Sequence, residues 1–123
     1  MKTYYNGDDY PFQEECYLII GVALEIHRIL GKGFSEIVYK DAFEYGLLSK
    51  CIFLWKGKKF LVNYKEVIPK HKFHADFVID DKIILEVKSN GIIVDEHYAQ
   101  VLNYLEISNL QIGLLVNFTD KSL

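Results

Sequence analysis

Two apolar runs joined by a polar turn constrain this chain more than any other stretch, because they carry charges that an ordinary buried strand would exclude. The stretch from His74 to Lys88 reads HADFVIDDKIILEVK. Side chains alternate between the two faces of a strand, so Glu86 and Lys88 share a face of a strand that is otherwise Ile, Leu and Val. Asp76 interrupts the first run in the same way. The pattern predicts an antiparallel hairpin with two carboxylates and a lysine at its open end.

The length of the turn decides whether these charges meet. Directly opposed residues of an antiparallel hairpin face the same side of the sheet. A two-residue turn would place Asp76 opposite Leu85 and send Glu86 to the other face, whereas a three-residue turn at residues 80–82 places Asp76 opposite Glu86. We predict the longer loop, or a bulge of equal parity. The paired carboxylates can then form a site for a divalent cation, as phosphodiester hydrolysis needs.

Composition limits the classes of protein to which the chain can belong. Its 123 residues are enough for one domain with a single core, and half of them are hydrophobic, which favours a folded chain. No apolar run approaches the roughly 20 residues that span a bilayer, and the first residues do not resemble a signal peptide. Cys16 and Cys51 are isolated and form no metal spacing. We therefore expect a reduced, cytoplasmic protein that does not enter a membrane.

The charge balance argues mildly against a large DNA-binding footprint. The formal net charge is -3, whereas proteins that contact many phosphates are usually basic. A local basic run exists, and it is either a phosphate-binding surface or, as we favour, a solvated pair of edge strands. It consists of Lys56, Lys58, Lys59, Lys65, Lys70 and Lys72.

The periodicity of apolar residues predicts an α/β fold. Helical spacing favours three helices, over residues 12–30, 35–50 and 95–108. The β-rich runs are 53–55, a turn at 56–58, then 60–64, followed by the central hairpin. The last run, residues 112–118, is almost unbroken and predicts a strand covered on both faces, parallel to its neighbour. We expect a mixed central sheet flanked by helices, formed by residues 12–123, with residues 1–11 as a loosely attached arm.

Several motifs now coincide, and together they resemble the GxxExxY proteins of the PD-(D/E)XK nuclease superfamily, whose fold is restriction-endonuclease-like. The segment GFSEIVY at residues 33–39 fits GxxExxY, and Asp76 followed by Glu86-Val87-Lys88 fits the D…ExK pattern. The segment QVLNY at residues 100–104 is similar to the QxxxY motif of RecB-type exonucleases. Each motif alone is weak, but all of them in this order form a strong signal. Ala75 stands where the superfamily's name has proline.

The resemblance implies a metal-dependent active site. Asp76 and Glu86 would hold Mg²⁺ or Mn²⁺, with the Val87 carbonyl as a further ligand, because hard divalent cations prefer oxygen ligands. Glu36 would complete or water-bridge the site. Lys88 would orient the attacking water or stabilise the charge that develops on the phosphate.

Two further residues are implied, and simpler interpretations remain open. Gln100 and Tyr104 share one helix face and would position Lys88, the water or the scissile strand, but they also fit a partly buried polar face. Lys88 could form a salt bridge with Glu86. Glu36 on composition alone is an acidic residue favoured at a helix N-terminus.

The predicted function is Mg²⁺-dependent hydrolysis of phosphodiester bonds in nucleic acid, and we expect the nucleic acid to be DNA rather than RNA. One alternative is a catalytically silent nucleic-acid-binding or regulatory module that keeps the nuclease fold. Another is a structural protein whose acidic residues form salt bridges and need no metal. A homo-oligomer or a partner protein could supply additional DNA-binding surface.

Overall fold

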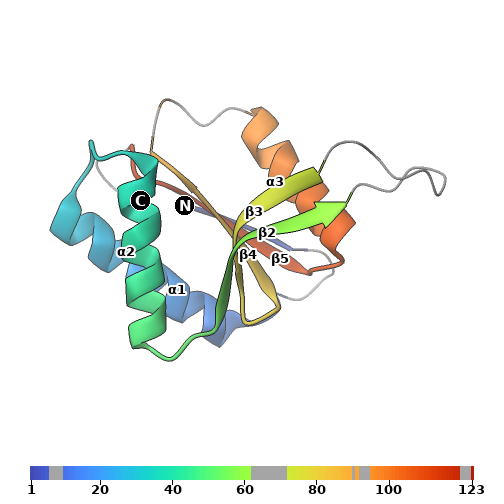
Figure 1. Ribbon diagram of the computed structural model, residues 1–123, viewed down its shortest axis with the longest axis horizontal. Helices are drawn as coiled ribbons and strands as arrows, with labels where there is room; N and C mark the ends of the chain where they lie inside the picture. The colour runs from blue at the N-terminus through green and yellow to red at the C-terminus, as the bar shows by residue number, and fades with distance from the viewer. Residues whose placement is uncertain (6–9, 62–71, 90, 92–94, 120–122) are drawn as a thin grey trace.

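A mixed sheet with helices on both faces organises the molecule (Figure 1). The computed structural model describes residues 1–5, 10–61, 72–89, 91, 95–119 and 123, apart from the side chains of Lys2 and Lys72. Within these residues, five strands form one sheet in the order β1-β5-β4-β3-β2. The elements are β1 (Lys2–Tyr5), α1 (Gln13–Leu30), α2 (Glu36–Ser49), β2 (Leu54–Leu61), β3 (Lys72–Ile79), β4 (Ile83–Lys88), α3 (Asp95–Ser108) and β5 (Ile112–Asn117). The predicted α/β class is confirmed.

The two faces of the sheet carry separate cores. Helices α1 and α2 cover one face and α3 covers the other (Figure 1). The larger core packs the buried residues of α1 and α2 against alternate residues of β3, β4 and β5. The smaller core contains Ala75, Val78, Ile84 and Leu105. No described helix is long and apolar enough to cross a bilayer.

The central strands are buried because they are covered from both sides. β5 pairs with β4 in parallel, and α3 is the connection between them, as expected for a crossover. All six residues of β5 are buried, which explains its unbroken apolar sequence. The predicted parallel last strand is confirmed.

The N-terminal segment is more ordered than the sequence suggested. Residues 2–5, which we expected in a loosely attached arm, form β1 and pair antiparallel with β5. Thr3 lies opposite Leu114, and Tyr5 lies opposite Ile112. The backbone groups on the free edge of β5 account for this pairing, since an unpaired edge is a template for another strand.

β2 is one continuous strand, so the predicted turn at residues 56–58 is wrong. Gly57 has a φ of 58° within the strand, a conformation that glycine adopts without steric cost. Its neighbours pair as Lys56↔Phe77 and Lys58↔Ala75, which places Gly57 opposite Asp76. The part of the predicted strand at residues 62–64 lies outside the described residues, as do Lys65 and Lys70.

Both strands change faces at this Gly57–Asp76 position. On β3, Phe77 belongs to the core under α1 and α2, whereas Ala75 belongs to the core under α3. Regular alternation would place these two residues on the same face. On β2, Lys56 reaches Glu44 of α2, whereas Phe60 packs against the core under α3. The irregularity therefore reverses the side-chain alternation of the hairpin at Asp76.

Candidate functional site

The loop between β3 and β4 has the predicted length of three residues. The strands pair as Ile79↔Ile83, Val78↔Ile84 and Phe77↔Leu85, which leaves residues 80–82 as the turn. Asp80 and Asp81 adopt left-handed conformations with φ of 53° and 54°, which Asp tolerates better than most residues. The predicted register is confirmed, and it brings Asp76 and Glu86 together.

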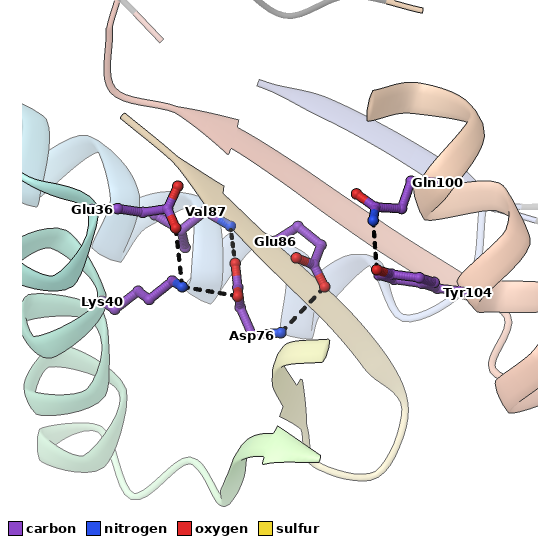
Figure 2. A network of polar contacts seen from close by, with 7 residues as sticks. All are labelled: Glu36, Lys40, Asp76, Glu86, Val87, Gln100 and Tyr104. Atoms are coloured by element: carbon purple, nitrogen blue, oxygen red, sulfur yellow. Dashed lines mark hydrogen bonds and ion pairs between the residues drawn. The ribbon is translucent and has the colours of Figure 1, made fainter. Parts of the chain in front are cut away.

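Beyond the last backbone pair of β3 and β4, two carboxylate side chains accept the hydrogen bonds of the backbone N–H groups (Figure 2). The backbone N–H of Asp76 donates to Glu86 Oε1 at 3.2 Å. In return, the backbone N–H of Val87 donates to Asp76 Oδ2 at 2.8 Å. Buried N–H groups need a partner, so these side chains replace the missing backbone acceptors. The reciprocal bonds fix both carboxylates at the point where the strands separate.

Glu86 is held in an environment that opposes its ionisation. Its side chain is buried, with a relative exposure of 5% for the residue. Burial, and then the nearby charge of Asp76, raises the pKa of the Glu86 carboxyl to about 8, while Lys88 acts in the opposite direction. Buried carboxylates of this kind are stabilised by a neighbouring cation.

Lys40 supplies a cation that the sequence analysis did not identify. Its Nζ lies 3.0 Å from Asp76 Oδ1 and 3.1 Å from Glu36 Oε2, so it joins the two carboxylates (Figure 2). Burial lowers the pKa of the Lys40 ammonium, but its contacts with Asp76 and Glu36 outweigh burial and raise it. The four-residue spacing of Glu36 and Lys40 was visible in the sequence. The contact with Asp76 was not, because it depends on how α2 packs on the sheet.

A buried tyrosine positions Glu36 at the start of α2. The hydroxyl of Tyr39 donates to the Gly31 carbonyl at 2.7 Å and accepts a bond from the Phe34 N–H at 3.3 Å. The Tyr39 ring stacks on Phe118, with centroids 4.3 Å apart. These contacts hold the loop between α1 and α2 against the core. The tyrosine of the GxxExxY pattern thus has a structural role in this chain, and the glutamate forms an ion pair with Lys40.

The oxygen atoms present suit a divalent cation, but the full ligand set is not gathered. Asp76 and Glu86 are adjacent, and carboxylate oxygens are the ligands that Mg²⁺ prefers. Among the residues that the structure describes, no three His, Cys, Asp or Glu side chains are spaced to hold one ion. Glu36 contacts Lys40 instead. The N–H of Val87 donates to Asp76, and the role of its carbonyl as a ligand stays a prediction.

The other predicted residues lie around the carboxylates. Lys88, half-buried at the end of β4, forms no ion pair with Glu86 within 4.0 Å, so the simpler salt-bridge interpretation is not supported between these two described residues. Gln100 Nε2 donates to the Tyr104 hydroxyl at 2.6 Å (Figure 2). Burial, and then the charges of Glu86 and Asp76, raises the pKa of the Tyr104 phenol. Tyr104 is therefore a protonated group close to the carboxylates.

A cavity of about 350 Å³ opens beside Asp76, between α2 and the β2–β3 hairpin. Its lining includes Lys40, Lys56 and His74, together with Asp76. His74 is exposed and pairs with Lys59 of β2. The cavity gives an external molecule access to the Asp76 side of the site.

Comparison with known proteins agrees with the geometry. The family model described as the PD-(D/E)XK nuclease superfamily matches residues 13–123. Curated proteins and solved structures give no significant match. The mixed sheet with flanking helices is consistent with a restriction-endonuclease-like fold, and nucleases of this superfamily generally use divalent metals. A match over this length, with acidic residues at the diverging ends of two central strands, shows that the chain belongs to the PD-(D/E)XK nuclease superfamily.

Proposed function

We propose that this protein is a nuclease of the GxxExxY group that hydrolyses phosphodiester bonds in DNA with Mg²⁺ or Mn²⁺. The observation that carries the proposal is the pair of carboxylates, Asp76 and Glu86, fixed by reciprocal hydrogen bonds where β3 and β4 separate. Fixed carboxylates lose little freedom when they bind a cation, which favours binding. We further propose that residues 12–123 form a single catalytic domain.

We assign a separate role in the reaction to each residue of the site. Asp76 and Glu86 would hold the ion, with the Val87 carbonyl and Glu36 as the remaining protein ligands. A bound divalent ion lowers the pKa of water and stabilises charge on the phosphate. Lys88 would orient the attacking water or stabilise the developing charge, because it ends the strand that carries Glu86.

Gln100 and Tyr104 would position the scissile strand from the other side. Their mutual hydrogen bond of 2.6 Å fixes the phenol, and a protonated phenol can donate to a phosphate oxygen. Lys40 would have to leave Asp76 when a metal ion binds there, because both need the same carboxylate oxygens.

A silent module that keeps the nuclease fold is the second candidate. The ion pairs of Lys40 with Glu36 and Asp76 favour it, because they give these acids a partner without any metal. The two candidates differ in whether a metal ion binds and whether a phosphodiester bond is then cut.

The first test is the change in Tm with millimolar Mn²⁺ or Mg²⁺, since an ion that binds only the folded state raises Tm. We expect a rise in wild type that Asp76→Asn and Glu86→Gln lose. Asp80→Asn is the matched control, because it removes a charge from the exposed turn of the same hairpin, and it should retain the rise. A flat wild-type response would contradict metal binding.

The second test is cleavage of labelled DNA and RNA, single-stranded and duplex, under the same metal conditions. Cleavage that requires Asp76, Glu86 and Lys88 would support the nuclease proposal. A metal-dependent rise in Tm with no cleavage of any of these substrates would favour the silent module.

Two further expectations concern the location of the protein in the cell and its binding partners. We propose a cytoplasmic location because Cys16 and Cys51 are both free in the structure, as in a reducing compartment. We also propose that a second copy or a partner protein adds phosphate-binding surface to this acidic chain. Efficient cleavage by a protein with a monomeric mass in solution would contradict the second expectation.

A further inference from the structure

A row of aromatic side chains crosses the α3 side of the sheet and ends at the candidate site. We define the aromatic row as Trp55, Phe60, Phe73 and Tyr104. Phe60 stacks on Phe73 with centroids 5.0 Å apart and ring planes at 16°. Phe73 in turn stacks on Tyr104, with centroids 3.9 Å apart and planes at 11°. Tyr104 bonds Gln100 on the same helix face, and the close view shows both beside Glu86 (Figure 2).

A lysine sits over this row. Lys58 Nζ lies 5.7 Å from the centroid of the Trp55 ring and 5.7 Å from that of the Phe60 ring. Both distances are within the range of a cation–π contact. The change of faces at Gly57 is the reason that Lys58 lies here while Lys56, two residues earlier, pairs with Glu44 on the other face.

The row remains accessible although its members are apolar. Trp55 is 48% exposed, and Phe60, Phe73 and Tyr104 are half-buried. The indole N–H of Trp55 donates to Asp81 Oδ1 at 3.1 Å, which fixes the orientation of the ring. An exposed aromatic ring with a fixed orientation and a cation beside it offers both a stacking surface and a charge for phosphate.

We propose that the aromatic row and Lys58 bind single-stranded nucleic acid, with an unpaired base stacked on the exposed Trp55 ring and a phosphate near Lys58. This inference rests on the proposed function, because it specifies the substrate class of the same site. Unpaired bases have free faces and stack on aromatic side chains without sequence preference. The bases of a duplex are already stacked on each other. The row therefore selects a single strand and leads it to Asp76 and Glu86.

Trp55 is the only tryptophan of the chain, so its fluorescence reports directly on the row. The experiment titrates the full chain with a thymidine oligonucleotide in EDTA, where no metal-dependent cleavage occurs. The same oligonucleotide annealed to its complement is the comparison. We expect saturable quenching by the single strand at concentrations roughly 10-fold or more below those needed for the duplex.

Two lysine variants test whether binding depends on the position of Lys58 over the rings or only on the total positive charge. Lys58→Gln should weaken binding of the single strand by about 5- to 10-fold. Lys56→Gln is the matched control, since it removes the same charge two residues away on the opposite face, and it should leave the affinity unchanged. Trp55→Leu, followed by the anisotropy of a fluorescein-labelled oligonucleotide, should also weaken binding, while circular dichroism checks that the variant is folded.

Three results would overturn the inference. They are an absence of quenching by the single strand, equal or tighter binding of the duplex, and equal losses in Lys58→Gln and Lys56→Gln. Because binding is measured in EDTA, these results are independent of the metal-dependent change in Tm. If the protein binds metal and cuts DNA without using the row, this inference is wrong and the proposed function stands. If it binds single strands in EDTA but shows no metal response, single-strand binding stands and the proposed metal-dependent function is wrong.

Discussion

The two faces of the sheet use aromatic residues in opposite ways. Under α1 and α2, Tyr39, Phe43 and Phe118 are fully buried, and the first two rings each contact Phe118. On the α3 side, Phe60, Phe73 and Tyr104 are only half-buried, and Trp55 is about half exposed. Buried rings contribute to the stability of the fold, whereas exposed rings contribute little. The comparison indicates that the aromatic residues on the α1–α2 side serve the core, whereas those on the α3 side are available for binding.

The candidate site lies at the boundary between these two faces. Asp76 sits where the side-chain alternation of β3 reverses, so its carboxylate contacts Lys40 of α2, and its backbone bonds Glu86. Glu86 lies on the side of Tyr104 (Figure 2). The site therefore draws residues from both faces, and substitutions on each face should affect different properties of the protein.

The largest expected effect comes from removing a buried ring. Phe43→Ala should lower the free energy of unfolding by about 3–5 kcal/mol, because it leaves a cavity among well-packed side chains. Trp55→Ala, the comparison on the α3 side, should cost on the order of 1 kcal/mol or less. Urea denaturation followed by circular dichroism measures both. Equal losses would show that the α3 side is as important for stability as the α1–α2 side.

A smaller effect on stability should come from pH, through the ionisation of Glu86 at the candidate site. The pKa of Glu86 is raised from 4.5 to about 8 in the folded protein. Between these values the folded state holds a proton that the unfolded chain releases, so stability falls as pH rises through this window. We expect the Tm in EDTA to drop by several degrees across it. Glu86→Gln should flatten this slope, and an unchanged slope would mean that another group titrates.

The smallest expected effect on stability comes from replacing a lysine. Lys40 and Lys56 both contact acidic residues of α2, but only Lys40 also contacts Asp76. Lys40→Met should lower the metal-free stability by on the order of 0.5–1 kcal/mol, because Glu36 and Asp76 then repel each other without a counter-ion. The same variant should show a larger rise in Tm with Mn²⁺, since Lys40 no longer competes for Asp76. Lys56→Met, which removes an exposed pair with Glu44, should change neither quantity. A smaller metal response in Lys40→Met would contradict the competition.

Much of the fold was predictable because local patterns and tertiary packing agree. The helix over residues 95–108 has the predicted limits, and the glycine at position 31 ends α1 with its N–H bonded to the His27 carbonyl. The three-residue loop was predicted on the assumption that Asp76 and Glu86 form one site, because a two-residue turn would place Asp76 opposite Leu85, and the observed register agrees. Gly57 was misread because a glycine between lysines has the same local pattern in a turn and in a bent strand.

The site was predictable in its acidic residues but not in its contacts. Asp76 and Glu86 interrupt apolar strands, and this conflict with burial made them visible in the sequence. Lys40 lies on a helix surface where lysine is ordinary, and its four-residue spacing from Glu36 indicated only an ion pair within the helix. Its ion pair with Asp76 depends on a contact between α2 and β3, which sequence spacing does not encode. The N–H contact of Val87 depends in the same way on the divergence of β3 and β4.

The short strand β1 has a consequence for the behaviour of the protein at high concentration. β5 consists entirely of buried residues, and without β1 it would be the outermost strand of the sheet. An apolar outermost strand readily recruits another chain and leads to aggregation. Pairing with Lys2–Tyr5 blocks this route. The N-terminal residues would thus protect solubility during expression and storage, although they are distant in sequence from every residue of the proposed reaction.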